Sequence, residues 1–202
     1  MAVYGWDETN AAEFITLINE FYKDTNFEAF FEENFSYFEK VIDRFNNQLY
    51  SRLNESWFIR WGLNPDGFSV TISPGRSYGG YGLSMYDELG KLKVCPNLPD
   101  LEDYSDRMPF LVHEFCHSFA NDIAEILYDK NETYRKICAD TLNPERLPHY
   151  TSKWAISGEY VTRAYTILYM VENENADLAE QFQIEIDKGF PYIADVYKMI
   201  TK

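Results

Sequence analysis

Residues 106–130 read DRMPFLVHEFCHSFANDIAEILYDK, and this stretch decides the fold class. Its apolar residues recur at the three- and four-residue spacing of one helix face. Ser105 or Asp106 is placed to cap the first turn. Pro109 is tolerated there because the first N–H groups of a helix have no partner within it. The stretch therefore predicts a helix from about residue 106 to Lys130.

Two histidines on this helix suggest a metal site. His113 and His117 are four residues apart, about 40° apart in projection, so both imidazoles lie on the same side of the helix. Glu114 lies about 60° from His117, where its carboxylate contacts a metal-activated water rather than the ion. With three histidines in 202 residues, a random arrangement gives H-E-x-x-H in well under roughly 1% of cases. The motif predicts a Zn²⁺ site with Glu114 as general base; the alternative is two histidines in ordinary hydrogen bonds.

A catalytic zinc site needs a third protein ligand. Glu159 is the best candidate, because the stretch 154–171 carries one other charge, Arg163, and a carboxylate in so apolar a helix needs a partner. That partner is either zinc, with Arg163 orienting the carboxylate or meeting a substrate carboxylate, or Arg163 itself in an ordinary ion pair. His149, in the preceding loop, is the rival third ligand; otherwise it is a donor near the metal or an exposed surface residue.

Other residues of the motif helix do not complete the site. The metzincin pattern requires glycine at position 120 and histidine at 123, where this chain has Ala120 and Ile123. Asp122 points to the far side of the helix, and Glu125 lies about 12 Å along the axis from the second histidine.

The third ligand can act only if its helix meets the motif helix. Small residues on both helices permit a close approach: Ala120 and Ala124 on one, Ala155 and Gly158 on the other.

The sequence HEFCHSFAN at 113–121, followed by a helical Glu159, resembles the gluzincin metallopeptidases, the group that includes thermolysin. It is also similar to an uncharacterised bacterial metallopeptidase family with the pattern HEFxHxFxN. The match covers residues 107–121, with a looser similarity at 158–165. The resemblance implies a zincin-like fold, a Zn²⁺ cofactor and a peptide or protein substrate. In thermolysin-like enzymes the residue four positions after the third ligand is acidic, whereas here it is Arg163.

Peptide hydrolysis also needs a donor to the developing oxyanion. The candidates in the right part of the chain are His149, Tyr150, Tyr160, Tyr165 and Arg163. With Glu114, we name His149, Tyr160 and Arg163 as the catalytic candidates. Two other functions stay open: a non-catalytic zincin-fold module that binds a peptide or glycan, and a zinc hydrolase acting on a non-peptide substrate.

The rest of the chain predicts an α+β fold, mainly helical, with a small antiparallel sheet before the active-site helix. Helical spacing covers residues 8–24, 26–49, 152–172 and 175–188, and a short segment after Pro191. Strand-like runs separated by turn sequences occupy 56–63, 68–73 and 81–86. We expect one domain over residues 1–202, with a helical part at 1–50, the sheet at 56–95 and a helical part at 106–202. Residues 78–86 form either an edge strand that binds a peptide or a hairpin without a ligand.

Composition limits the partners. The chain has 33 Asp plus Glu against 18 Lys plus Arg, and its net charge is -15. Phosphate groups need clustered cations, so neither nucleic acid nor an anionic membrane is expected as a partner. The apolar stretch 154–171 contains charged residues, which favours a buried helix over membrane insertion. The oligomeric state is not predicted.

The three cysteines, Cys95, Cys116 and Cys138, are widely spaced, so we expect buried thiols rather than disulfides. The N-terminus MAVYGWDETN lacks the features of a signal peptide. We expect a soluble protein, either cytoplasmic or a secreted or periplasmic domain without its leader.

Overall fold

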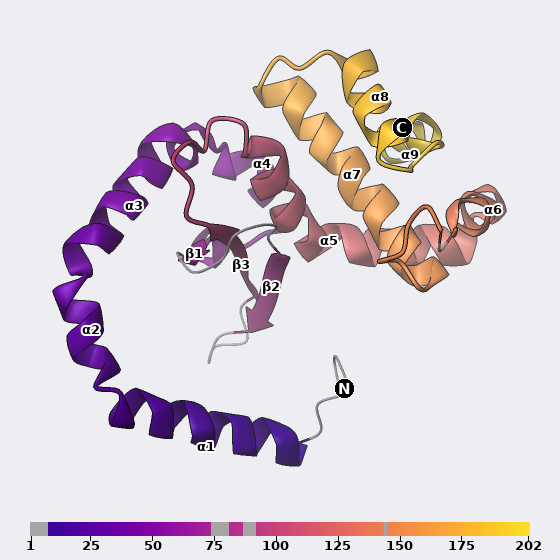
Figure 1. Ribbon diagram of the computed structural model, residues 1–202. Helices are drawn as coiled ribbons and strands as arrows, with labels where there is room; N and C mark the ends of the chain where they lie inside the picture. The colour runs from indigo at the N-terminus through magenta and orange to yellow at the C-terminus, as the bar shows by residue number, and fades with distance from the viewer. Residues whose placement is uncertain (1–7, 74–80, 87–91, 144) are drawn as a thin grey trace. The chain divides into compact units, whose positions relative to one another are not determined.

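The computed structural model describes residues 8–73, 81–86, 92–143 and 145–202. Helices dominate these residues and accompany one small sheet, which agrees with the predicted α+β class (Figure 1). The chain divides into two compact units, Met1–Arg44 and Phe45–Lys202. The sheet and the motif helix belong to the second unit.

The N-terminal part is helical, as the spacing predicts. It consists of α1 (Glu8–Asp24), α2 (Phe27–Glu33) and α3 (Phe35–Gln48). Asparagines mark the two breaks. Asn26 adopts the left-handed conformation at φ 50, which asparagine tolerates better than most residues. Asn34 donates its side-chain amide to the Phe30 carbonyl at 2.7 Å, which satisfies a carbonyl at the end of α2.

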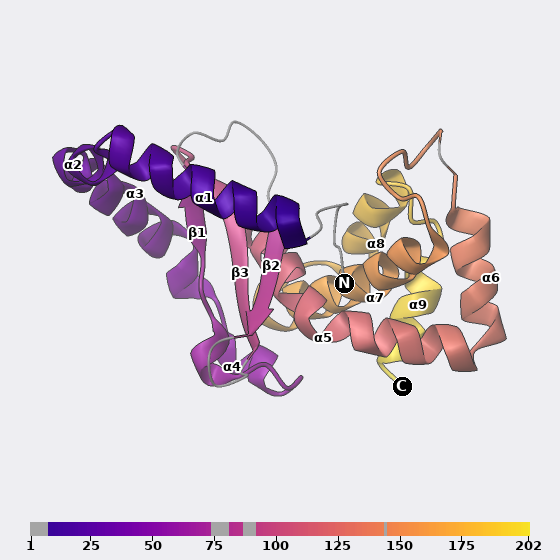
Figure 2. The ribbon, with the colours of Figure 1, turned by 90° about the horizontal axis from the view of Figure 1, so that it is seen from below.

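The sheet contains β1 (Thr71–Ser73), β2 (Tyr81–Tyr86) and β3 (Leu92–Pro99), in the order β1-β3-β2 (Figure 2). β2 pairs antiparallel with β3, but β1 pairs parallel with it. The prediction of an all-antiparallel sheet is therefore wrong. Alternation along a run predicts a strand, but it does not tell which neighbour the strand pairs with or in which direction. β2 lies at the edge of this sheet, while residues 78–80 of the predicted edge strand fall outside the described residues.

The predicted strand at 56–63 is also wrong, because its first half is the short helix α4 (Glu55–Ile59). Trp57 and Phe58 are buried in the core, and Trp61, one turn after Trp57, packs partly against it. A short apolar run of this kind is consistent with either a buried strand or a buried helix, and here the helix forms. Short 3-10 turns at Tyr50–Arg52 and Pro65–Gly67 flank α4.

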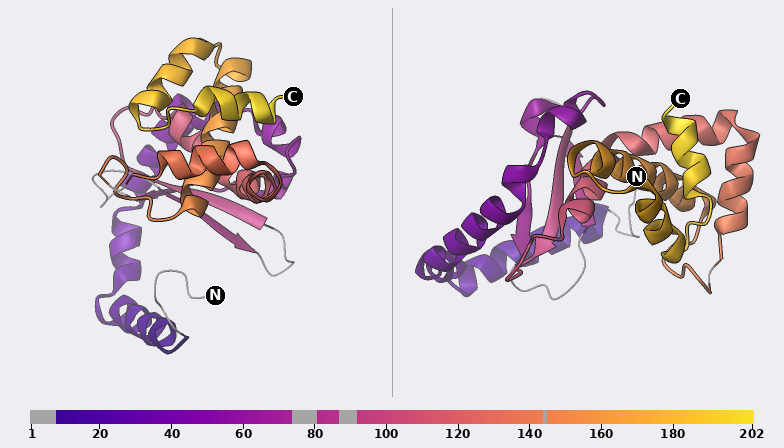
Figure 3. Two further views of the ribbon diagram at one scale, coloured as in Figure 1. Left: turned by 90° about the vertical axis from the view of Figure 1, so that its right-hand side faces the viewer. Right: turned by 90° about the horizontal axis from the view of Figure 1, so that it is seen from above.

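The C-terminal part contains α5 (Met108–Lys130), α6 (Glu132–Thr141), α7 (Lys153–Asn173), α8 (Leu178–Asp187) and α9 (Ile193–Ile200). α6 was not predicted; it begins where the Asn131 side chain accepts a hydrogen bond from the Tyr134 amide at 3.1 Å. α8 begins three residues later than expected, because the Asp177 carboxylate accepts from the Glu180 amide at 2.9 Å. α8 and α9 pack against α7 (Figure 3).

The start of α5 differs in detail from the prediction. Its N-cap position is Arg107, without a side-chain cap, so neither Ser105 nor Asp106 caps the helix. Pro109 lies in the first turn as expected.

α5 and α7 pack directly against each other at small residues. Ala120 and Ala124 are buried, and the Ser157 hydroxyl donates to the Ala124 carbonyl at 3.3 Å. A Cβ on Gly158 would lie 2.8 Å from the Asn121 side-chain oxygen, so only glycine fits there without a shift. Ala155 is exposed, and the expectation that it contributes to this contact is wrong.

The three cysteines are buried and free, as predicted. Within the described residues, no helix combines the length and the apolar character needed to cross a membrane.

Candidate metal centre

The structure brings His113 and His117 of α5 together with Glu159 of α7. Their ligand atoms all lie within 4.8 Å of one another. The two Nε2 atoms are 3.1 Å apart. His113 Nε2 lies 3.6 Å from Glu159 Oε2, and His117 Nε2 lies 3.5 Å from Oε1. The three predicted ligands therefore form one cluster, although Glu159 lies 42 positions after His117 in the sequence.

These separations, in which the two histidines face different oxygens of Glu159, are close to those between the ligand atoms of a tetrahedral metal site. Zinc bound by nitrogen and oxygen at about 2.0–2.1 Å places neighbouring ligand atoms about 3.3–3.4 Å apart. Glu159 Oε2 is buried and makes no hydrogen bond among the described residues, but its charge is met by the Arg163 guanidinium at 3.0 Å. A cation at the centre of the cluster would satisfy this oxygen and both imidazoles. The residues present therefore fit a zinc ion.

The imidazole of His117 is oriented by groups on both helices. Its Nδ1 lies 3.1 Å from Thr162 Oγ1 and 3.5 Å from Asn121 Oδ1. With the proton on Nδ1, the ring donates to these oxygens and its Nε2 lone pair faces the cluster. Sequence analysis missed both residues. Asn121 lies one turn after His117 and could have been found by helical spacing, whereas Thr162 is brought there by the packing of α7.

Burial and the neighbouring charges set the protonation of the three residues. Burial lowers the pKa of His113 from 6.5 to about 3, so this imidazole is neutral. Burial alone would raise the pKa of Glu159, but the hydrogen bond with His117 and the charge of Arg163 outweigh it and lower that pKa to about 2. Burial also lowers the pKa of His117, but the hydrogen bond and charge of Glu159 outweigh it and raise that pKa. A neutral imidazole and an ionised carboxylate are the forms that bind metal, so His113 and Glu159 have the binding form, whereas a metal ion at His117 must displace the proton that its raised pKa favours.

Arg163 forms the ion pair with Glu159 that its spacing of four residues allows. Its guanidinium lies 3.0 Å from Glu159 Oε2, but it also donates to Glu185 Oε2 of α8 at 2.6 Å. It donates to the Tyr150 hydroxyl at 3.3 Å and lies 4.2 Å from the Phe190 ring centroid. The shorter contact of Arg163 is therefore with Glu185 and not with Glu159. The Glu159 carboxylate still faces both histidines.

Glu185 is a site residue that sequence analysis missed. Its side chain is 11% exposed, and Lys188 donates to its second oxygen at 2.7 Å. The spacing of Glu185 and Lys188 on one helix suggests only a local pair. Nothing in the sequence indicates that α8 folds back onto Arg163.

Glu114 is 8% exposed, on the same helix as both histidine ligands. Burial lowers the pKa of His117, and the negative charge of Glu114 acts with that of Glu159 to raise it.

The other catalytic candidates have different surroundings. His149 is exposed in its loop and does not join the cluster. Tyr160 is buried, and its hydroxyl pairs with Thr141 Oγ1 at 2.7 Å. Tyr165 is buried against Trp61, with ring centroids 4.7 Å apart.

Tyr150 is linked to the cluster through Arg163. Its hydroxyl meets Arg163, and burial together with the Glu159 charge raises its pKa. Tyr150 and Arg163 thus contact each other beside Glu159, whereas the hydroxyl of Tyr160 is engaged by Thr141 and His149 is not part of the three-residue cluster.

Comparison of the chain with protein-family models, curated proteins and solved structures found no match. The case for a zinc site therefore rests on the residues of the chain and their geometry.

Proposed function

We propose that this protein is a zinc-dependent peptidase of the gluzincin type. His113, His117 and Glu159 hold the ion, and Glu114 is the general base. The observation that carries the proposal is the separation of 3.1, 3.5 and 3.6 Å between the three ligand groups. An ordinary ion pair does not require two imidazoles to converge on one carboxylate at these distances.

The residues around the ion have separate tasks. When bound, zinc lowers the pKa of a coordinated water towards about 7 and polarises the substrate carbonyl. Glu114 accepts the proton of the attacking water and returns it to the leaving amine. Thr162 orients the His117 ring through a hydrogen bond, and Arg163 orients the Glu159 carboxylate through an ion pair.

Tyr150 is the best placed oxyanion donor. Arg163 is engaged by two carboxylates, whereas the Tyr150 hydroxyl is only partly buried and lies beside the guanidinium. A phenol in this position can donate to an oxygen that gains negative charge during the reaction.

The sheet supports a peptide substrate. β2 is an edge strand, and α5 packs against both β2 and β3. An edge strand offers unpaired backbone groups that can align an extended peptide by β-augmentation. In the proposed function, the edge of β2 is the surface that receives the peptide.

The proposal is tested by measuring zinc content and peptide cleavage in the same preparations. Protein purified without added zinc is expected to hold about one zinc per chain. It should cleave a mixed peptide library, and Glu114→Gln should keep the zinc but lose at least about 100-fold in rate. Asp122→Asn, which makes the same charge change on the exposed side of α5, is the matched control and should cleave normally.

Protein without zinc would contradict the metal site. Protein with stoichiometric zinc whose cleavage is unaffected by Glu114→Gln would contradict the peptidase mechanism. Stoichiometric zinc without any cleavage would favour the non-catalytic binding module.

A further inference from the structure

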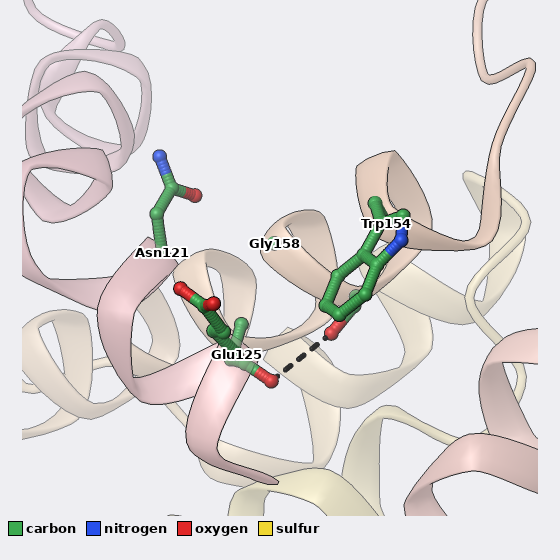
Figure 4. A pocket seen from close by; sticks show the side chains of 6 residues that line it. Asn121, Glu125, Trp154 and Gly158 are labelled. Atoms are coloured by element: carbon green, nitrogen blue, oxygen red, sulfur yellow. Dashed lines mark hydrogen bonds between the residues drawn. The ribbon is translucent and has the colours of Figure 1, made fainter. Parts of the chain in front are cut away.

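A pocket of about 330 Å³ lies between α5 and α7, beside the metal cluster (Figure 4). Three residues of each helix line it: Asn121, Ala124 and Glu125 from α5, and Trp154, Ser157 and Gly158 from α7. Its volume lies at the lower end of the range of about 300–1,000 Å³ that small-molecule pockets occupy, and it has room for one large side chain.

The pocket continues the helix face that carries the ligands. Asn121 and Glu125 follow His117 at intervals of four residues, so each lies about 6 Å further along the same side of α5. On α7, Gly158 directly precedes Glu159. Asn121 connects the pocket and the metal cluster. Its side-chain oxygen lies 3.5 Å from His117 Nδ1, and the residue also lines the pocket. The pocket and the metal cluster are thus adjacent.

An aromatic ring and a carboxylate flank the pocket. Trp154 is 54% exposed, and its ring is held against Tyr128 with centroids 4.5 Å apart. Glu125 is exposed on α5, and among the described residues no cationic side chain forms an ion pair with it. Figure 4 shows Glu125 and Trp154 on the two facing helices. A π-face together with an unpaired carboxylate is the combination that binds a guanidinium or ammonium group.

We propose that this pocket binds a lysine or arginine side chain of the peptide substrate. This inference rests on the proposed peptidase function. Glu125 neutralises the cation and the Trp154 indole stacks on it, while the net charge of -15 attracts basic peptides. The pocket residues lie about 6–12 Å along α5 from His117, and an extended peptide spans about 3.3–3.6 Å per residue. The basic residue therefore lies about two or three positions from the scissile bond.

Binding, rather than cleavage, tests this pocket. The probes are alanine octapeptides carrying one arginine moved through the internal positions, each paired with the same peptide carrying neutral, nearly isosteric citrulline. The protein is the full chain with Glu114→Gln, loaded with zinc, and affinity is measured by isothermal titration calorimetry. At one or two positions the arginine peptide should bind about tenfold more tightly than its citrulline partner.

Variants separate the pocket from the overall acidic charge. Glu125→Gln should remove most of the difference between arginine and citrulline, and Trp154→Ala should reduce it. Asp122→Asn makes the same charge change within one helical turn of Glu125 but outside the pocket. It should leave the difference in affinity between arginine and citrulline peptides intact.

Equal affinity for arginine and citrulline peptides would overturn the pocket proposal, as would equal losses in Glu125→Gln and Asp122→Asn. Neither result would affect the peptidase proposal, which depends on zinc content and cleavage by the native chain. A Glu125-dependent preference in a protein that cuts no peptide would support the pocket and count against the peptidase.

Discussion

At the scale of single residues, Glu185 decides how Arg163 acts on the metal site. The guanidinium lies between two carboxylates, and Glu185 takes its shorter contact at 2.6 Å, against 3.0 Å for Glu159. Without Glu185, the buried cation would have Glu159 as its remaining carboxylate partner and would compete with the ion for it. Residues that position a ligand in this way typically change metal affinity by about 10–100-fold.

We therefore predict that Glu185→Gln lowers zinc affinity by about 10–100-fold, measured by competition with a chromophoric chelator. Glu180→Gln, an exposed change on the same helix, is the control and should bind zinc like the native chain. Native affinity in Glu185→Gln would show that Arg163 does not compete for Glu159.

The contrast between these residues shows what a sequence can tell about a site. His113, Glu114 and His117 lie within five positions, so helix geometry alone relates them to one another. Glu159 could be proposed because a carboxylate in an apolar helix needs a partner. Glu185 sits among other polar residues of α8, and its role depends on a chain reversal that no local pattern encodes.

At the scale of elements, the candidate metal site depends on how closely α5 and α7 approach. The ligands come from both helices, and the contact between Ala124 and Ser157 sets their separation next to the site. A larger side chain at this contact must push the helices apart or strain the core.

We predict that Ala124→Leu lowers the free energy of unfolding by about 1–3 kcal/mol and weakens zinc binding. Urea denaturation and the chelator competition measure the two effects. Ala155→Leu, the same substitution at an exposed position of α7, should change neither. An Ala124→Leu protein with native stability and native zinc affinity would show that the helix spacing is not limiting.

Sequence patterns identified the long elements better than the short ones. The 3.6-residue period gave α1, α5 and α7 to within a few residues, because it persists over several turns. The run at 56–63 is too short for periodicity to separate strand from helix, and its aromatic composition favoured the wrong choice. The pairing of β1 with β3 is a long-range property, so its parallel direction could not be deduced from the strand itself.

At the scale of the whole molecule, the two units differ in how they use their apolar residues. The stripe that predicts α1 remains 45–60% exposed: Phe14, Ile15, Ile18, Phe21 and Tyr22. In the second unit, the comparable residues of α5 and α7 are buried in one core. The same helical pattern therefore predicts the helix in both cases but not what covers its apolar face.

The packing of the second unit is what turns a five-residue motif into a three-ligand cluster. α5 carries two ligands because of its own period, and α7 brings the third because the two helices pack through small residues. The central claim is that this cluster holds zinc through Glu159.

The most direct test compares the zinc content of Glu159→Ala and His149→Ala with that of the native chain, by elemental analysis after dialysis against a weak chelator. We predict that the native protein and His149→Ala retain about one zinc per chain, whereas Glu159→Ala loses it, because two histidines alone hold zinc weakly. Zinc retained in Glu159→Ala but lost in His149→Ala would contradict the account.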